Sequence, residues 1–142
     1  MSIRQISVFL ENRSGRLANV CKLLGENEID IVAISISDTT DFGILRLIVD
    51  KPQRAEEVLS EERFTVNSTR VLAVRVEDVP GGLAAVLELL AGADMGVEYM
   101  YAVGKETRGA IIIMKIKDCV KAERFLDGQK VELLTENKLH NL

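Results

Sequence analysis

Two stretches, "ENRSGRLANVCKLL" at residues 11–24 and "EDVPGGLAAVLELL" at residues 77–90, write the same pattern 66 residues apart. The match continues without a gap over Ile6–Gly43 and Leu72–Gly109. In both copies an alternating apolar run leads into a glycine-containing turn and then into an apolar helical stripe. An internal repeat of this extent in a chain of 142 residues predicts two copies of one small structural unit.

Each copy begins with a strand followed by a helix. Residues 3–10 alternate between apolar and more mixed positions, which is the pattern of a strand. Residues 15–27 carry apolar side chains at the i, i+3, i+4, i+7 spacing of an amphipathic helix. Ser14 precedes this helix and is expected to be its N-cap. In the second copy Pro80 is expected in the first turn of the corresponding helix, where proline is tolerated.

Two further strands, a second helix and a last strand complete each copy. In the first copy we expect them at residues 30–37, 43–50, 52–62 and 63–70, with Pro52 beginning the helix. In the second copy we expect them at residues 97–103, 109–116, 118–127 and 129–136. The order βαββαβ predicts an α+β fold of two tandem ferredoxin-like units, with antiparallel sheets packed together. We expect one domain at residues 1–69 and the other at residues 70–142.

The two copies are joined directly. Residues 65–76, "TVNSTRVLAVRV", contain no Gly or Pro, so we expect rigid docking of the units. The strands at 43–50 and 109–116 are apolar at nearly every position, which indicates sheets covered on both faces. A unit of about 70 residues has a marginal core by itself. We therefore expect packing between the units and with a second copy of the chain, as a homodimer.

Composition and charge argue against several classes of function. The chain is 47% hydrophobic and 28% charged, which is typical of a globular protein. Its net charge of -4 and pI near 5.1 argue against a nucleic-acid partner, which needs clustered Lys and Arg. No run of 18 apolar residues and no charged-then-apolar leader occurs. We therefore expect no membrane association and a cytoplasmic location.

Residues suited to catalysis or metal binding are few and scattered. Cys21 and Cys119 match no metal-binding or redox spacing, and Cys21 falls within an apolar helical stripe. His140, the single histidine, lies in a polar C-terminal tail without obvious ligand partners. No nucleophile–base pair recurs in both copies. The sequence therefore predicts no catalytic site, no metal and no cofactor.

The turn between the first strand and the first helix carries unusual residues in both copies, "ENRSGRL" and "EDVPGGL". Glycine at a helix start lets another group approach the backbone, and the free N–H groups of the first turn suit a carboxylate. Asn12 or Asp78 adds an oxygen that can accept a hydrogen bond from an ammonium group. Together these features predict a receptor for a free α-amino acid. The competing interpretation is structural, because glycine-containing helix starts are common and Asn and Asp often cap helices.

These residues resemble the ACT domain, a small βαββαβ regulatory module, in two tandem copies that cover essentially the whole chain. "VEDVPGGLAAVLELL" is similar to the family's D-x-P-G-x-L phrase, whereas the first copy has Ser14 in place of the proline. The resemblance implies that amino acids bind at the seam between paired domains, where this loop of one domain faces the second strand of its neighbour.

The resemblance also points to particular residues. In serine-regulated dehydrogenases the contacts come from an Asn in the loop and an Asn at the start of the second strand. The first position matches Asn12 and Asp78 here, and the second matches Asp30 and Gly96. Gly96 lacks a side chain, so the copies are unequal. Tyr99 is expected either to wall the pocket or to belong to the core. The expected ligand-binding residues are Asn12, Arg13, Ser14, Gly15, Arg16, Leu17, Asp30, Ile31, Asp78, Val79, Pro80, Gly81, Gly82, Leu83, Val97 and Tyr99.

The function implied by the resemblance is that of a non-catalytic regulatory protein that senses a free amino acid and transmits the signal through domain packing. An alternative is a regulatory subunit that docks on a metabolic enzyme and binds no ligand itself. RNA-recognition modules share the order of elements, but the acidic chain and the absence of an aromatic residue in "RGAIIIMKI" argue against them. An acylphosphatase-like phosphate loop would need the arginines of the first loop in both copies, and the second has Val79 and Gly82 there.

Overall fold

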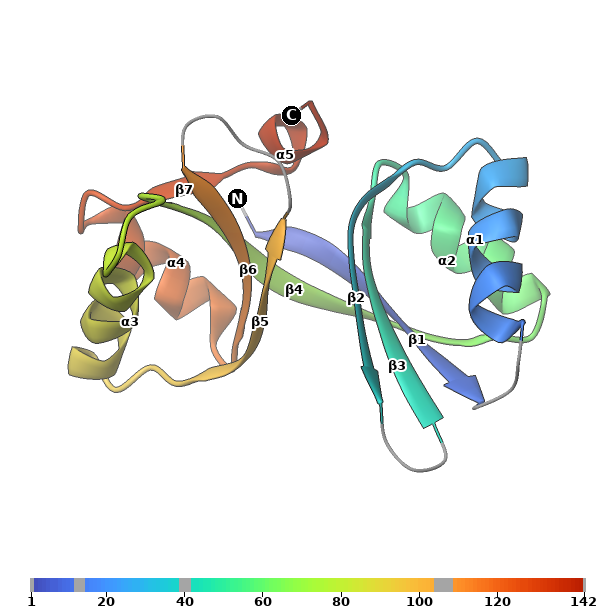
Figure 1. The fold of residues 1–142 in the computed structure, drawn as a ribbon, viewed down its shortest axis with the longest axis horizontal. Coiled ribbons are helices and arrows are strands. Elements are labelled where there is room, and N and C mark those ends of the chain that lie inside the picture. Colours follow the sequence, from blue (N-terminus) through green and yellow to red (C-terminus); the bar gives the residue numbers. More distant parts are fainter. Residues whose placement is uncertain (1, 12–14, 39–41, 104–108, 142) are drawn as a thin grey trace. The chain divides into compact units, whose positions relative to one another are not determined.

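The computed structural model describes residues 2–11, 15–38, 42–103 and 109–141. Its helices and strands follow the predicted order, with one short helix added at the C-terminal end (Figure 1). Along the chain they are β1 (Ile3–Glu11), α1 (Arg16–Glu26), β2 (Ile31–Asp38), β3 (Phe42–Val49), α2 (Pro52–Glu61), β4 (Thr65–Val76), α3 (Gly82–Gly92), β5 (Val97–Val103), β6 (Ala110–Ile116), α4 (Cys119–Asp127), β7 (Glu132–Leu134) and α5 (Glu136–His140). The antiparallel pairings and the βαββαβ repeats confirm the predicted fold class.

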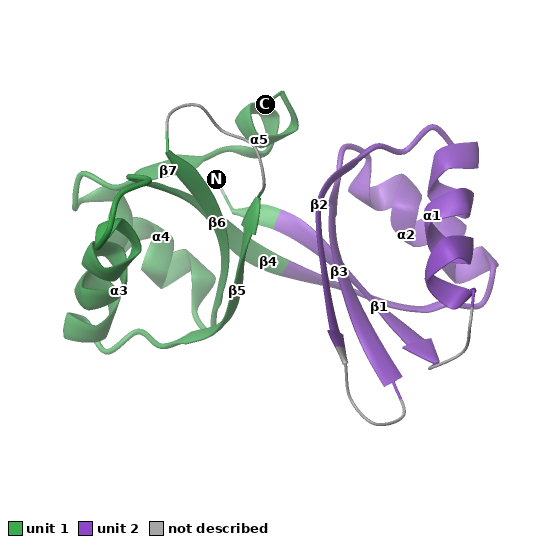
Figure 2. Cartoon of the chain, viewed as in Figure 1, with its two compact units in different colours: residues 1–3, 70–142 green, residues 4–69 purple. Residues whose placement is uncertain are grey.

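The chain forms two compact units, which Figure 2 shows in different colours. Unit 2 consists of residues 4–69, and unit 1 consists of residues 1–3 and 70–142. The strand β4 is continuous over its 12 residues and contributes its first part to unit 2 and the rest to unit 1. The stretch without Gly or Pro is therefore one strand that ends the first repeat and begins the second.

In unit 2 the strands lie in the order β2-β3-β1-β4, and α1 and α2 cover one face of the sheet (Figure 1). The helices bury Val20 and Leu24 from α1 and Val58 and Leu59 from α2 against the strands. Each such side chain stabilises the fold by roughly 1.5–3 kcal/mol when fully buried. Pro52 occupies the first turn of α2, as predicted, where its missing N–H has no partner to lose.

In unit 1 β6 lies between β5 and β4, and β7 pairs with β4. The helices α3 and α4 pack on this sheet through Val86, Leu90, Ala122 and Leu126. On the face away from the helices, residues such as Ile113 are also buried, in keeping with strands that are apolar at almost every position. None of the described helices is long and apolar enough to cross a membrane.

The C-terminal segment differs from the prediction. We expected a strand over residues 129–136 followed by a polar tail, but β7 has only three residues and α5 follows it. The Thr135 hydroxyl accepts a hydrogen bond from the Lys138 N–H at 3.2 Å and so caps the start of α5. Leu139 is then fully buried, which anchors this polar segment. The predicted strand was too long, because β7 ends at Leu134 and α5 begins at Glu136.

The helices end in the same way in both units. Glu28 after α1 and Asp94 after α3 have positive φ angles of 56° and 58°, and Arg63 and Lys130 take the same conformation after α2 and α4. At the end of α3 the N–H of Met95 donates to the carbonyl of Leu90 at 2.9 Å, which is the closing bond of a Schellman motif. The repeat therefore extends to left-handed helix ends made by non-glycine residues.

Candidate functional site

The start of α3 is a tight turn followed directly by a helix. The N–H of Gly82 donates to the carbonyl of Val79 at 3.0 Å, and Gly81 has φ 86° and ψ -6°. Proline in the second place and a left-handed glycine in the third are the features of a type II turn. Pro80 therefore belongs to the turn before the helix, and its predicted place in the first helical turn was wrong. The reason is that the positive φ of Gly81 ends the turn, so the helix begins only at Gly82.

The first turn of α3 has no side-chain cap. Gly81 is the N-cap residue and has no side chain to offer, so the N–H groups of Leu83 and Ala84 have no acceptor within the helix. The first helical bond runs from the N–H of Ala85 to the carbonyl of Gly81 at 3.1 Å. These free donors carry the positive end of the helix dipole and favour a negatively charged partner.

A cavity of about 440 Å³ opens beside this turn. Four predicted residues line it: Val79, Pro80, Gly81 and Gly82. The two predicted residues that flank them are not part of the lining, since Asp78 is exposed and Leu83 packs against the core of unit 1.

The sequence reasoning missed the far wall of this cavity, which is the connection between α4 and β7 at Gln129, Lys130 and Val131. A signal for it was available. In a βαββαβ unit the last strand pairs with the first, as Arg75 pairs with Glu132 here. That pairing brings the connection before the last strand next to the loop that follows the first strand. Lys130 adds a positive charge to the same wall.

The corresponding helix start in the first copy is described only in part, because Asn12, Arg13 and Ser14 lie outside the described residues. The N-cap of α1 is Gly15, with φ 89° and ψ -9°, so the helix is capped by Gly15 and not by Ser14 as predicted. The physical reason is again the left-handed glycine, which places the non-helical residue one position later. The N–H of Asn19 donates to the carbonyl of Gly15 at 2.9 Å, matching the bond at the start of α3.

Two predicted residues of α1 follow this cap. The guanidinium of Arg16 lies 4.4 Å from the ring centroid of Phe64, as a cation–π contact within unit 2. Both residues border a cavity of about 250 Å³ on α1. Leu17 is 38% exposed, so its side chain is available at the surface beside the loop.

The predicted residues at the strand starts have different surroundings in the two units. In unit 2 the N–H of Asp30 donates to the Asp50 carboxylate at 2.9 Å, and the Asp50 N–H donates to the Asp30 carbonyl at 3.1 Å. Ile31 packs against the core. In unit 1 Val97 lines a second, larger cavity of about 940 Å³. Tyr99 is half-buried on the face of the sheet away from the helices, opposite Lys115.

Within unit 1 the structure thus brings four residues of the second loop together at one cavity. Within unit 1 the loop residues Val79–Gly82 and the strand residue Val97 line different cavities. The loop cavity borders the uncapped first turn of α3 and is lined by the charged side chains of Arg75, Lys130 and Glu77.

The thiol closest to these sites is Cys119, the first residue of α4, which is buried and lines the larger cavity. Burial raises the pKa of this thiol, and the carboxylate of Glu123 adds to the rise, which the positive charges of Lys115 and Arg70 reduce. A raised thiol pKa lowers the thiolate fraction at neutral pH and disfavours nucleophilic chemistry.

Comparisons with known proteins agree with this architecture. The family model described as an ACT domain pair matches residues 1–142. Among solved structures, the chain is similar to protein BT0572 from Bacteroides thetaiotaomicron, with 37% sequence identity over 100% of this chain and 98% of that chain, and a TM-score of 0.94. No curated protein matches the chain in sequence.

Two more distant structures share the fold. The regulatory subunit of aspartate kinase from Thermus thermophilus, in its ligand-free form, is 17% identical over 89% of this chain and 92% of that chain, with a TM-score of 0.63. The regulatory subunit of aspartate kinase from Thermus flavus is 17% identical over 88% and 90%, with a TM-score of 0.61. The match of the family model over the whole length confirms the resemblance seen in the repeated loops, and the chain belongs to the family of ACT domain pairs.

Proposed function

We propose that this ACT domain pair is a non-catalytic regulatory protein that binds a free amino acid at the start of α3. The α-carboxylate of the amino acid accepts hydrogen bonds from the free N–H groups of the first helical turn. The carboxylate of Asp78 accepts from its ammonium group. A neighbouring ACT domain supplies the rest of the site through the start of its second strand.

The observation that carries this proposal is the uncapped first turn of α3. It is held open by the left-handed Gly81 and borders the cavity of about 440 Å³. A ligand carboxylate would satisfy donors that the helix itself cannot, and Lys130 on the opposite wall strengthens the attraction for an anion.

The two copies are not equivalent in this proposal. In the second copy the loop residues Val79–Gly82 line the cavity, with Leu83 supporting them from the core side. Val97 and Tyr99 do not line this cavity within unit 1, so they would contribute as the second strand of a neighbouring domain. In the first copy the contacts would come from Asn12, Arg13, Ser14, Gly15, Arg16 and Leu17, with Asp30 and Ile31 at the strand start. Since the loop residues Val79–Gly82 line one cavity together, we assign the stronger site to the second copy.

A regulatory role is supported by the kind of protein that shares this fold. The two similar aspartate kinase chains are regulatory subunits, and the present chain covers about nine tenths of their length, 92% and 90%. By this analogy the ligand changes the packing of domains or subunits. The change alters the contacts with the partner, which is either the second chain of a homodimer or a metabolic enzyme.

A thermal-shift screen with the twenty amino acids tests this function. A ligand present at about 100 times its Kd should raise the free energy of unfolding by roughly 2.7 kcal/mol, so we expect one or a few amino acids to raise the Tm clearly. The variant Asp78→Ala should lose most of this shift, because the ammonium group loses its acceptor. The control Asp127→Ala removes an equally exposed carboxylate at the end of α4 and should keep the shift.

A flat screen would contradict amino-acid binding. If an enzyme then co-purified with the unliganded protein, the alternative of a docking subunit without a ligand would be favoured. If the ligand still raises the Tm of Asp78→Ala, a residue other than Asp78 must bind the ammonium group.

A further inference from the structure

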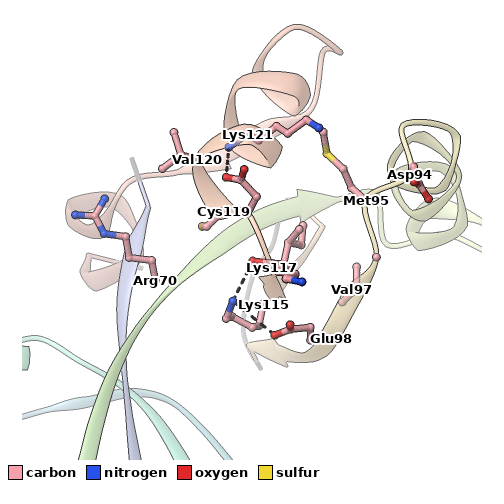
Figure 3. Close-up of a pocket in the computed structure, with 13 residues that line it drawn as sticks. Arg70, Asp94, Met95, Val97, Glu98, Lys115, Lys117, Cys119, Val120 and Lys121 are labelled. Carbon is pink, nitrogen blue, oxygen red and sulfur yellow. Dashed lines mark hydrogen bonds and ion pairs between the residues drawn. The ribbon is translucent and has the colours of Figure 1, made fainter.

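A cavity of about 940 Å³ in unit 1 is separate from the α3 loop. It lies where the end of β6 leads into α4 and where the connection after α3 enters β5 (Figure 3). Its apolar lining comes from Met95, Val97, Ile116, Cys119 and Val120. The volume falls in the range of small-molecule pockets, which are about 300–1,000 Å³.

In unit 2 the same corner of the repeat is closed by hydrogen bonds. Lys51 Nζ donates to the carbonyl of Glu28 at 2.5 Å, and Arg54 Nη2 donates to Asn27 Oδ1 at 3.2 Å. The Asp50 carboxylate accepts from the N–H of Asp30 at 2.9 Å. These bonds tie the start of α2 and the end of β3 to the connection between α1 and β2.

The sequence explains why this closure is absent from unit 1. The strand pairings give the correspondence, because Val97 pairs with Ile116 as Ile31 pairs with Val49, so Lys117 stands where the first copy has Asp50. Ala93 stands where the first copy has Asn27, so both side-chain acceptors are missing. Asp118, the N-cap of α4, takes the place of Lys51, the N-cap of α2, and Lys121 takes the place of Arg54. The corner has therefore lost both acceptors and carries the positive charges of Lys117 and Lys121.

The negative charges around the cavity are largely committed. Glu98 pairs with Lys115 at 3.6 Å, and the Asp118 carboxylate accepts from the N–H of Lys121 at 3.1 Å as the cap of α4. Within the described part of the chain, the side chains of Lys117 and Lys121 have no ion pair. With Arg70 they outnumber Asp94 and Asp118, the two acids of the lining for which the described part of the chain shows no ion pair.

We propose that this cavity is a second ligand site that binds a small organic polyanion, such as a phosphate ester or a di- or tricarboxylate. The anionic groups bind Lys117, Lys121 and Arg70, and the carbon skeleton lies on the apolar lining around Val97 and Ile116. This site goes beyond the proposed amino-acid site, because it involves different residues and a different class of ligand.

Titration calorimetry on the full chain, with phenyl phosphate and citrate as probes, tests the proposal. The variant Lys117→Gln/Lys121→Gln should raise the Kd of whichever probe binds by about tenfold, since two exposed cationic contacts are lost. The control Lys22→Gln/Lys138→Gln lowers the net charge equally at exposed positions outside the cavity and should leave the Kd unchanged. Binding of phenyl phosphate alone assigns the site to phosphate esters, and binding of citrate alone assigns it to polycarboxylates.

The proposal is overturned if neither probe binds, if the cavity variant binds as tightly as the wild type, or if both variants weaken binding equally. The last outcome would mean attraction to overall charge. Amide shifts in the labelled wild-type protein provide a check that is independent of how well the variant folds. Binding must move the signals of residues 94–98 and 115–121, and shifts confined to other residues would also overturn the proposal. Because the probes are not amino acids, failure here leaves the amino-acid site untouched.

Discussion

At the scale of single residues, the second loop depends on two glycines for different physical reasons. Gly81 has open space around it, with no atom within 4 Å of a Cβ built there, but its φ of +86° is one that side-chain-bearing residues rarely adopt. Gly82 is constrained by space, because a Cβ would meet the carbonyl oxygen of Glu77 at 2.0 Å. Glycine therefore permits close approach here, but the group that approaches Gly82 is the chain's own backbone.

The contact at Gly82 predicts a strongly position-dependent effect of adding one methyl group. Gly82→Ala should lower the free energy of unfolding by roughly 1–3 kcal/mol, because the turn or the strand end must move. Gly92→Ala, at the other end of α3 and with no atom within 4 Å, should raise stability by about 0.5–1 kcal/mol through helix propensity. Urea unfolding of both variants measures the difference. Equal stabilities would show that the loop yields to the methyl group at no cost.

The two cysteines provide a second prediction at the residue scale. Because the pKa of Cys119 is raised and the residue is 8% exposed, its thiolate fraction stays low as the pH rises through the usual range of thiols. With iodoacetamide under native conditions we expect Cys21 to be alkylated before Cys119 at neutral pH, and Cys119 only at more alkaline pH. Mass spectrometry of the peptides gives the order, and the unfolded chain in urea, where both should react, is the control. Faster labelling of Cys119 would contradict its burial.

At the scale of elements, the helix ends were not predicted from the sequence. Glycine normally marks a left-handed residue after a helix, but Arg63 and Lys130 adopt this conformation without it. The bonds that follow compensate for the strain, as when the N–H of Phe64 donates to the carbonyl of Leu59 at 3.0 Å. The sequence gives no signal for these helix ends except that they fall at matching positions of the two repeats.

This strain predicts a stabilising substitution. Arg63→Gly should raise the free energy of unfolding by about 1 kcal/mol, because glycine adopts a φ of 65° without the cost that Cβ imposes. In a chain of this size that corresponds to a rise in Tm of about 3 °C. Arg63→Ala is the matched control: it removes the same exposed side chain but keeps the Cβ, so its Tm should not rise. A gain in both variants would trace the effect to the lost charge.

β7 is shorter than the strand that the sequence predicts, which is also an effect at the element scale. Residues 129–136 have the composition of a strand, yet only Glu132–Leu134 pair with β4. The cap at Thr135 and the burial of Leu139 stabilise a helix over the remaining residues. The composition of these residues favours a strand. It does not show which apolar residue is buried in the core, and the helix was therefore not predicted.

At the scale of the whole molecule, the repeat determined what could be predicted. Matching Ile6–Gly43 with Leu72–Gly109 was enough to predict the βαββαβ order and the family, because two aligned copies confirm each other's strands and helices. The repeat also drew attention to the loop residues Val79–Gly82, which line a cavity in the structure. The wall at Lys130 and the cavity around Lys117 were missed, since they arise from pairings and lost contacts that appear only in three dimensions.

The two units share a fold but differ where ligands would bind. The hydrogen bonds of Asp50 and Lys51 close a corner of unit 2 that stays open in unit 1. The two units thus share one scaffold. The second copy lacks two acceptor side chains that the first copy has, which changes its surface and leaves its core unaltered. This asymmetry supports the proposal that ligand binding is concentrated in unit 1.

The account rests most heavily on the claim that the start of α3 binds the carboxylate of a free amino acid. The most direct test is to follow the amide signals of Gly81, Gly82, Leu83 and Ala84 in a labelled protein while the amino acid selected by the thermal-shift screen is added. The account predicts that these four signals move furthest and saturate together. If they stay unchanged while the bound amino acid shifts the signals of other residues, the claim is contradicted.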